Sequence, residues 1–282
     1  MNNDLKIKKV WFVTGASQGL GLSLTKKLLG AGYRVAATSR NVDNLSKAVG
    51  DETDNFLPLR VDLADEQSVE KAVESTRGKF GEINVVVNNA GYGIGGAIEE
   101  LSREEIRQSF DVNVFGTLNV IKKVMPILRE QRSGHIINIA SIAGFAAANG
   151  WAIYAAAKFA VVGLSEVLAE DVQEFGIKVT VVNPGAFRTN FLTAESLSIA
   201  ASPIADYKSV RQSHEKYLKM DGTQIGDPEK AAAVFIEIAE NPNPPVRLFL
   251  GSDAYQRAVQ KTELIKNDLE TWKNISSSTD FS

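Results

Sequence analysis

The sequence predicts an α/β fold: one doubly wound, mostly parallel sheet of about seven strands with helices on both faces. Three observations predict it. Short apolar runs of strand length alternate with helical patterns along most of the 282 residues. A glycine-rich turn joins the first apolar run to the first helical pattern. No internal repeat, low-complexity segment or Pro/Gly linker divides the chain, so we expect one domain over residues 1–282.

The expected strands are the short apolar runs. Pro58 indicates an irregularity in the third of them, because proline cannot donate to a strand ladder. In chain order the strands are expected at 9–14, 34–39, 56–61, 83–88, 135–140, 178–183 and 246–250.

The expected helices carry periodic apolar residues and recognisable start signals. Asp65 and Asp227 are candidate N-caps, and Ser102 with Glu105 forms a capping box. The helices are expected at 19–31, 65–79, 102 to about 130, 152–175, from 227 onward and 252 to about 272. Residues 190–226 lack clear periodicity and are expected to form a mobile substrate-binding lid, 252–282 a C-terminal extension, and 276–282 a frayed tail.

Composition excludes several classes of function. The net charge is −3, with no basic stripe for nucleic acid and no polybasic patch for a membrane surface. The apolar runs are far shorter than the ~20 residues of a membrane helix, and the N-terminal Met1–Lys9 is polar. The chain has no cysteine and two histidines, which disfavours a metal site or a Ser/His/Asp triad. We therefore expect a cytoplasmic enzyme or binding protein without a metal.

The turn Thr14–Gly21 has the chemistry of a pyrophosphate site. Its glycines let the backbone approach a ligand, and the helix that follows offers free N–H groups and a positive dipole end. The alternative is a tight turn without a ligand, which the preceding strand and the amphipathic helix disfavour. The candidate contacts are Gly15, Ser17, Gln18, Gly19, Leu20 and Gly21.

The end of the second strand predicts which dinucleotide binds. Proteins that bind NAD usually place an acidic residue there to hold the ribose 2′-OH. This chain has Ser39 and Arg40 instead, and a guanidinium suits a 2′-phosphate. We expect NADP(H) to be preferred over NAD(H). A solvated surface arginine is the alternative.

Tyr154 and Lys158 lie four residues apart on an expected helix and therefore share one face. A lysine ammonium and a positive nicotinamide ring favour a phenolate, so we expect the pKa of Tyr154 to be lowered. Ser141 ends the strand before this helix and can hold a substrate oxygen near the tyrosine. A Tyr-x-x-x-Lys pair alone is more often a surface feature.

Together these motifs resemble the short-chain dehydrogenase/reductase family, a Rossmann-type fold, over about Lys9–Leu250. Thr14–Gly21 resembles the family's T-G-x-x-x-G-x-G turn. The other matching motifs are Asp62-Leu63 at the adenine, Asn88-Asn89-Ala90-Gly91, the tetrad Asn113, Ser141, Tyr154 and Lys158, and Pro184-Gly185 with Thr189 at the nicotinamide.

The resemblance implies a role for each catalytic residue. Tyr154 exchanges a proton with the substrate oxygen, Lys158 lowers the tyrosine pKa and binds the nicotinamide ribose, and Ser141 orients the substrate. Asn113 holds a water that links Lys158 to solvent, at a local distortion of its helix. Tyr154 and Lys158 thus also contact the cofactor.

The expected reaction is hydride transfer between NADP(H) and a ketone or aldehyde and its alcohol, most often as reduction. A non-catalytic NADP(H) sensor is the alternative, although such proteins usually lose the tyrosine or the lysine. A sugar-nucleotide epimerase or dehydratase needs a larger C-terminal domain. Phe187 beside the nicotinamide turn is expected to narrow the pocket. The candidate pocket residues are Phe145, Trp151, Phe187, Phe191 and Leu192, with Arg188 as a weaker candidate for an acidic substrate.

We also expect a homodimer. The resemblance implies one interface from the helices at 102–130 and 152–175 and a second from 228–240 and 246–250. The extension leaves directly from the last strand with apolar residues to cover, so we expect it to cap the second interface and leave an isologous dimer. If it packs elsewhere, a tetramer remains possible.

Overall fold

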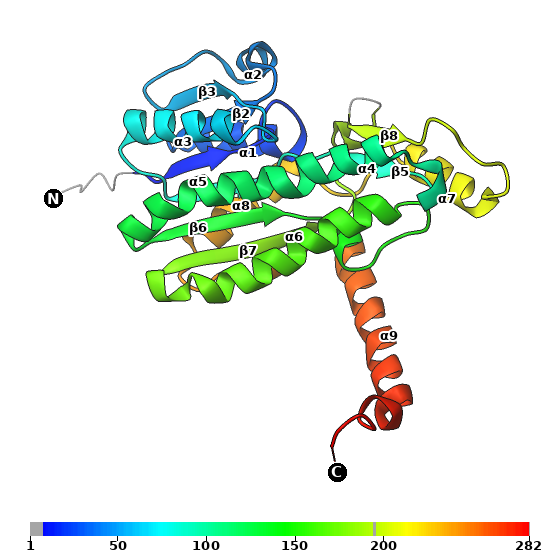
Figure 1. The fold of residues 1–282 in the computed structure, drawn as a ribbon. Helices are drawn as coiled ribbons and strands as arrows, with labels where there is room; N and C mark the ends of the chain where they lie inside the picture. The colour runs from blue at the N-terminus through cyan, green and yellow to red at the C-terminus, as the bar shows by residue number, and fades with distance from the viewer. Residues whose placement is uncertain (1–7, 194–195, 282) are drawn as a thin grey trace.

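The computed structural model describes residues 8–193 and 196–281. Residues 1–7, 194–195 and 282, which include most of the polar N-terminal segment, part of the expected lid and the last tail residue, lie outside the described residues. Seven strands form one sheet in the order β3-β2-β1-β4-β6-β7-β9, and every neighbouring pair is parallel (Figure 1). The predicted fold class is confirmed.

Each strand of this sheet begins and ends within two residues of the predicted apolar run. They are β1 (Val10–Val13), β2 (Arg34–Ser39), β3 (Phe56–Arg60), β4 (Val85–Asn88), β6 (Gly134–Ile139), β7 (Ile177–Pro184) and β9 (Arg247–Leu250). The irregularity predicted at Pro58 is wrong, because Pro58 pairs in register with Ala37. β3 is the edge strand, where a missing N–H costs no ladder bond.

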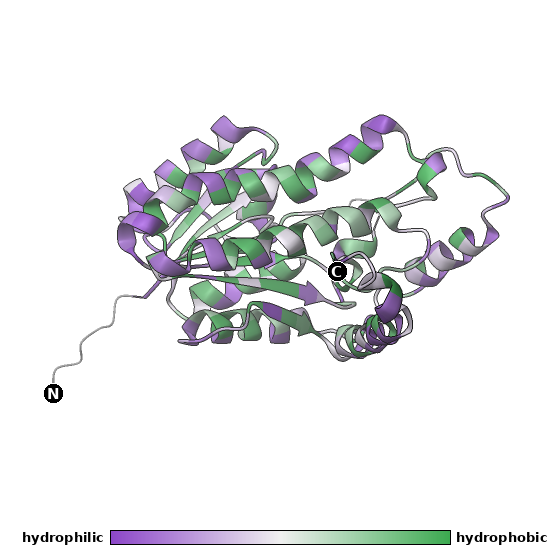
Figure 2. Cartoon of the chain, turned by 60° about the horizontal axis from the view of Figure 1, so that its bottom comes forward, coloured by the Kyte–Doolittle hydropathy of each residue, from purple (hydrophilic) through white to green (hydrophobic). Residues whose placement is uncertain are grey.

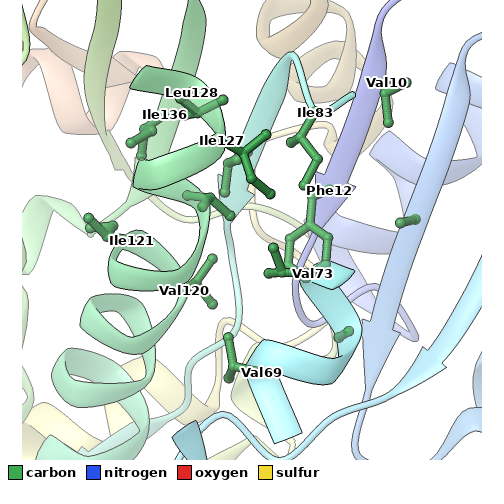
Figure 3. Packing of buried hydrophobic residues seen from close by; sticks show 14 of the residues in the cluster. Val10, Phe12, Val69, Val73, Ile83, Val120, Ile121, Ile127, Leu128 and Ile136 are labelled. Carbon is green, nitrogen blue, oxygen red and sulfur yellow. The ribbon is translucent and has the colours of Figure 1, made fainter. Parts of the chain in front are cut away.

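Helices cover both faces of the sheet. The first face carries α3 (Glu66–Phe80), α5 (Gly116–Gln131) and α6 (Ala152–Asp171). Apolar residues of α3 and α5 meet those of the strands in one buried cluster (Figure 3), and partly buried residues of α6 pack against it. The second face carries α1 (Gly19–Gly30), α2 (Val42–Val49) and α8 (Pro228–Glu240). Because each of these helices packs one face against the sheet, it carries both apolar and polar residues, as Figure 2 shows.

The predicted helix starts are confirmed. Asp65 accepts a hydrogen bond from the backbone N–H of Gln67, and Asp227 caps α8 in the same way. Ser102 and Glu105 form the predicted capping box at the start of α4 (Arg103–Phe110). The long helix that follows is interrupted by a π-helical turn, Asp111–Phe115, before α5 begins.

The sequence analysis missed α2 and a small second sheet of β5 (Gly93–Gly95) and β8 (Leu197–Ile199). The lack of clear periodicity in the expected lid did not indicate the regular elements that this segment contains. Residues 190–226 contain β8, the short helix η5 (Asn190–Leu192) and α7 (Lys208–Leu218).

The extension forms α9 (Ser252–Ser276), as predicted, but its expected position is wrong. Ala254 and Ala258 at its base are buried against Ile142, Phe145 and Phe249, and the rest of the helix projects away from the body (Figure 1). Only its base contacts β9, through Phe249, and the projecting part does not cap the α8 and β9 side. Its apolar residues are exposed, among them Tyr255, Leu264, Leu269 and Trp272.

One helix of the described residues, α6, is long and apolar enough to span a membrane by length and composition. Its inner face packs against β7 and η3 (Ile142–Gly144) and buries Tyr154, Ala157, Lys158 and Val161. We therefore interpret its hydropathy as that of a core helix.

Candidate active site

A cavity of about 850 Å³ opens at the carboxyl end of the sheet. It extends across the ends of β1 and β4, where the chain reverses its direction of strand addition, which is the usual ligand position in doubly wound folds. All predicted catalytic and cofactor-binding residues line it except Gly21 and Asn113.

The glycine turn shapes one wall of this cavity. Gly15 has φ +64°, and a Cβ there would lie 2.8 Å from the Cα of Ala90. A Cβ on Gly21 would lie 2.5 Å from the Asn89 Nδ2, so this glycine serves close packing behind the wall rather than ligand contact. The turn is held in place by Asn89, whose amide donates to the carbonyls of Thr14 and Gly15.

The N-terminus of α1 is suited to an anion. Its N-cap, Gln18, makes no side-chain capping bond, whereas α2, α3, α4 and α8 all have one. The Gln18 amide instead donates to Ser196 Oγ in the lid at 2.8 Å. The free N–H groups of α1 and the tight glycine backbone therefore fit a dinucleotide pyrophosphate.

The adenosine end of the cavity carries Ser39, Arg40, Asp62 and Leu63, as predicted. Ser39 Oγ donates to Ser17 Oγ at 3.2 Å and accepts from the Asn41 N–H. Arg40 is exposed at the cavity edge, directly after β2. The carboxylate of Asp62 accepts from the backbone N–H of Ala64, which fixes the turn after β3.

Tyr154 and Lys158 lie one turn apart on the inner face of α6. Both are buried, and the Lys158 Nζ lies 5.8 Å from the centre of the Tyr154 ring. Lys158 donates to the Ile139 carbonyl at 3.1 Å, which anchors the ammonium at the end of β6. Ser141 follows β6 and lines the cavity beside them.

Burial dominates the proton affinities of this pair. It raises the pKa of Tyr154 to about 12, although the Ser141 hydroxyl acts in the opposite direction. Burial also lowers the pKa of Lys158 to about 8. The expected lowering of the Tyr154 pKa is therefore not found in the chain by itself. The free-energy cost of removing a phenolate from water exceeds the stabilisation that the nearby groups provide.

Asn113 lies in the π-helical turn, at the helix distortion that the resemblance implied. Its Nδ2 donates to the carbonyls of Tyr92 and Ser109, and its Oδ1 accepts from the Tyr92 N–H. A Cβ on Gly91 would lie 2.6 Å from this Oδ1 and 3.2 Å from the Lys158 Nζ. The Asn113 Oδ1 and the Lys158 Nζ therefore both lie close to Gly91; Lys158 and Gly91 line the cavity, and Asn113 lies behind them.

The turn after β7 brings Pro184, Gly185, Phe187 and Thr189 to the cavity, as predicted. Thr189 Oγ1 accepts from the Phe191 N–H and starts η5. Of the candidate pocket residues, Trp151, Phe187, Phe191 and Leu192 line the cavity. Phe145 does not; it packs against Phe249, with ring centres 5.1 Å apart.

The sequence analysis missed the contribution of α9. Asp253 Oδ2 accepts from the Ala186 N–H at 2.8 Å, and the carboxylate packs against Gly185, which leaves no space for a side chain there. One turn later, Arg257 donates to the Ala146 carbonyl. Both side chains line the cavity. The order of the strands could have indicated this contribution, because β9 lies beside β7 and the residues that follow the two strands must meet.

This fold and site define an oxidoreductase. The chain belongs to the short-chain dehydrogenase/reductase family: the family model described as short chain dehydrogenase matches residues 9–198. It is an enzyme of the class that acts on CH–OH and C=O groups with NAD(P)(H).

Particular relatives cover nearly the whole chain. The oxidoreductase BOA17 of Botryotinia fuckeliana is 36% identical over 95% of this chain and 98% of its own. The 3-ketodihydrosphingosine reductase of Bacteroides thetaiotaomicron is 36% identical over 86% of this chain and 88% of its own. Among solved structures, a short-chain dehydrogenase from Streptomyces avermitilis has a TM-score of 0.89 and 33% identity, and the match covers 96% of this chain and 100% of that one.

Proposed function

We propose that this protein is an NADP(H)-dependent carbonyl reductase that reduces a ketone or aldehyde to the alcohol. One observation carries the proposal: Tyr154 is buried beside Lys158 and Ser141 at a cavity lined by apolar side chains. A cofactor sensor would need neither a buried proton donor nor a buried cation beside it.

The nicotinamide, when bound, supplies the hydride. The raised pKa of about 12 keeps the Tyr154 phenol protonated at neutral pH, so its O–H can donate to the carbonyl oxygen. The Ser141 hydroxyl donates to the same oxygen and holds it at the phenol. With a pKa of about 8, Lys158 is mostly charged at neutral pH and stabilises the phenolate that forms. Asn113 holds the water that returns a proton through Lys158.

The preference for NADP(H) rests on the end of β2. At the end of β2 the cavity edge offers Arg40 and Ser39, with Ser17 beside them. The Asp62 carboxylate at this end of the cavity comes from the turn after β3, where it accepts from the Ala64 N–H. A guanidinium and two hydroxyl groups suit the ribose 2′-phosphate, which an acidic residue at the end of β2 would repel.

A carbonyl panel run with NADPH and with NADH, followed by nicotinamide absorbance, tests this function. Tyr154→Phe should lose ~10²-fold or more of kcat and retain NADPH binding, because the ring still packs while the proton donor is gone. Tyr255→Phe, on the exposed side of α9, is the control for loss of a phenol and should keep wild-type kcat. A Tyr154→Phe variant with a tenth of wild-type kcat contradicts the assignment.

We further propose a cytoplasmic homodimer with no nucleic-acid or membrane partner. The helices that form the family's first interface expose Phe115, Phe159 and Val167 on their outer side, and an apolar surface of this kind is suited to a symmetry-related copy. The dimer was first expected because α9 would cap the α8 and β9 side. The projecting part of α9 does not do so, and the proposed dimer therefore depends only on the exposed surface of Phe115, Phe159 and Val167.

A further inference from the structure

We propose that the substrate carries a negatively charged group, such as a carboxylate or phosphate, at a distance from its carbonyl, and that Lys216 and Arg257 bind it. This inference rests on the proposed reduction of a carbonyl in the same cavity. It concerns the end of the cavity beyond Tyr154, which α7, α9 and the loop 145–151 enclose.

The two cationic side chains belong to helices that are bound to opposite ends of one short loop, residues 145–151. Arg257, on α9, donates to the Ala146 carbonyl at the start of the loop. α7 is bound to the end of the same loop: Ser213 Oγ donates to the Asn149 carbonyl, and His214 Nε2 lies 2.9 Å from the Gly150 carbonyl. Lys216 is on α7, and both Lys216 and Arg257 line the cavity.

Neither cation is neutralised within the described residues. On α7 the nearby Glu215 is paired with Lys219, at 4.0 Å, and not with Lys216. Arg257 makes one hydrogen bond, to a carbonyl, which leaves further guanidinium N–H donors. The Asp253 carboxylate, four residues before Arg257 on α9, also lines the cavity. It lies against Gly185 on the nicotinamide side, where its Oδ2 accepts from the Ala186 N–H and its buried Oδ1 has no partner within the described residues.

Two buried polar side chains at this end point to the same chemistry. Gln224 is 2% exposed and Trp151 is 6% exposed, and both line the cavity. Two donors, the Gln224 Nε2 and the Trp151 Nε1, and one acceptor, the Gln224 Oε1, have no hydrogen-bond partner within residues 8–193 and 196–281. Leaving buried polar atoms unpaired is costly, so a ligand with acceptor atoms for the two donors is favoured here, and the Gln224 Oε1 can accept from a donor on the same ligand.

The remaining wall is apolar or aromatic, with Ala147, Ala148, Phe191, Leu192, Tyr217 and Met220. Tyr217 and Trp151 meet edge to face, with ring centres 5.2 Å apart. The cavity therefore suits an apolar body between a carbonyl at Tyr154 and an anionic group at the two cations. Arg188, the earlier candidate for an acidic substrate, does not line the cavity; its Nε donates to the Gln224 carbonyl.

The test compares matched substrates that differ only in charge. Oxocarboxylic acids of graded chain length, their methyl esters and the corresponding amino ketones are assayed with NADPH. At the optimal chain length, kcat/KM for the acid should exceed that for the ester by about tenfold or more, which is the worth of one charge-assisted contact. Added salt should lower the acid's advantage and leave the ester unchanged.

The variants assign this preference to residues. Lys216→Gln and Arg257→Gln should each lower kcat/KM for the acid several-fold and spare the ester, and Arg257→Lys should retain most of the preference. Lys219→Gln is the matched control, since Lys219 is the C-cap of the same helix and is 80% exposed at its side chain but does not line the cavity. Thermal unfolding and NADPH binding identify any variant that has lost its fold. If Arg257→Gln has lost its fold, Arg257→Lys is used in its place.

Equal kcat/KM for acid and ester at every chain length, or a preference for the amino ketone, overturns the inference and leaves the proposed reductase intact. An acid preference that both Gln variants retain also overturns it, because other groups then bind the charge. An enzyme that reduces no carbonyl compound in the panel overturns the proposed function and this inference together.

Discussion

Replacing Gly91 by alanine tests whether the spacing of Asn113 and Lys158 matters for turnover. The Cβ would lie 2.6 Å from the Asn113 Oδ1, while ordinary contact begins at 3.4 Å, so this oxygen must retreat by about 0.8 Å. The Lys158 Nζ, at 3.2 Å, must also shift by a few tenths of an ångström. A displacement of this size in a catalytic group can lower kcat by ~10²-fold.

The same substitution has a separable effect on stability. Overpacking costs about 1–3 kcal/mol, which lowers the Tm of a chain of this size by about 2–10 °C. Gly78→Ala is the matched control: Gly78 is inside α3, with nothing within 4 Å of its would-be Cβ, so alanine there should stabilise the helix and leave kcat unchanged. A Gly91→Ala enzyme with near wild-type kcat at a temperature where it is folded would refute the reasoning.

Three further predictions concern the cofactor, the buried lysine and the assembly. Arg40→Ala should lower kcat/KM with NADPH by about 10- to 100-fold and spare NADH, as one charge-assisted contact is lost; a wild type that uses both cofactors equally would contradict this. Burial lowers the pKa of Lys158 from 10.5 to about 8, so the unfolded chain binds more protons between these values and the free energy of unfolding should rise with pH there. Lys158→Met should remove that rise in denaturant titrations, whereas the raised pKa of Tyr154 acts in the opposite direction only above pH 10. Light scattering after size exclusion should give a dimer mass at micromolar concentration, and a tetramer mass would exclude the proposed assembly.

The sequence was sufficient wherever short-range chemistry determines structure. The helix caps at Asp65, Ser102 and Asp227, the glycine turn and the Tyr154–Lys158 spacing each act within a few residues, and the structure places them as expected. The doubly wound parallel sheet followed from the alternation of strands and helices.

The missed elements depend on contacts distant in the sequence. β5 and β8 have three residues each and pair across about a hundred residues, with Gly93 opposite Leu197, so neither has a local pattern to recognise. The pKa of Tyr154 depends on how deeply α6 is buried, which the spacing of two residues does not encode. The helix α7 within the expected lid was missed because it is mostly polar outside Val210 and His214, its two buried residues.

The division of α9 into a buried base and a projecting remainder determines where this enzyme can be altered by protein engineering. Asp253 and Arg257 both belong to the first two turns, so a chain shortened to residue 251 would lose a wall of its cavity along with its helix. A chain shortened to residue 262 would keep that wall and both buried alanines. Affinity tags, surface tethers or fused reporter domains are therefore best attached beyond the second turn, where the side chains face solvent.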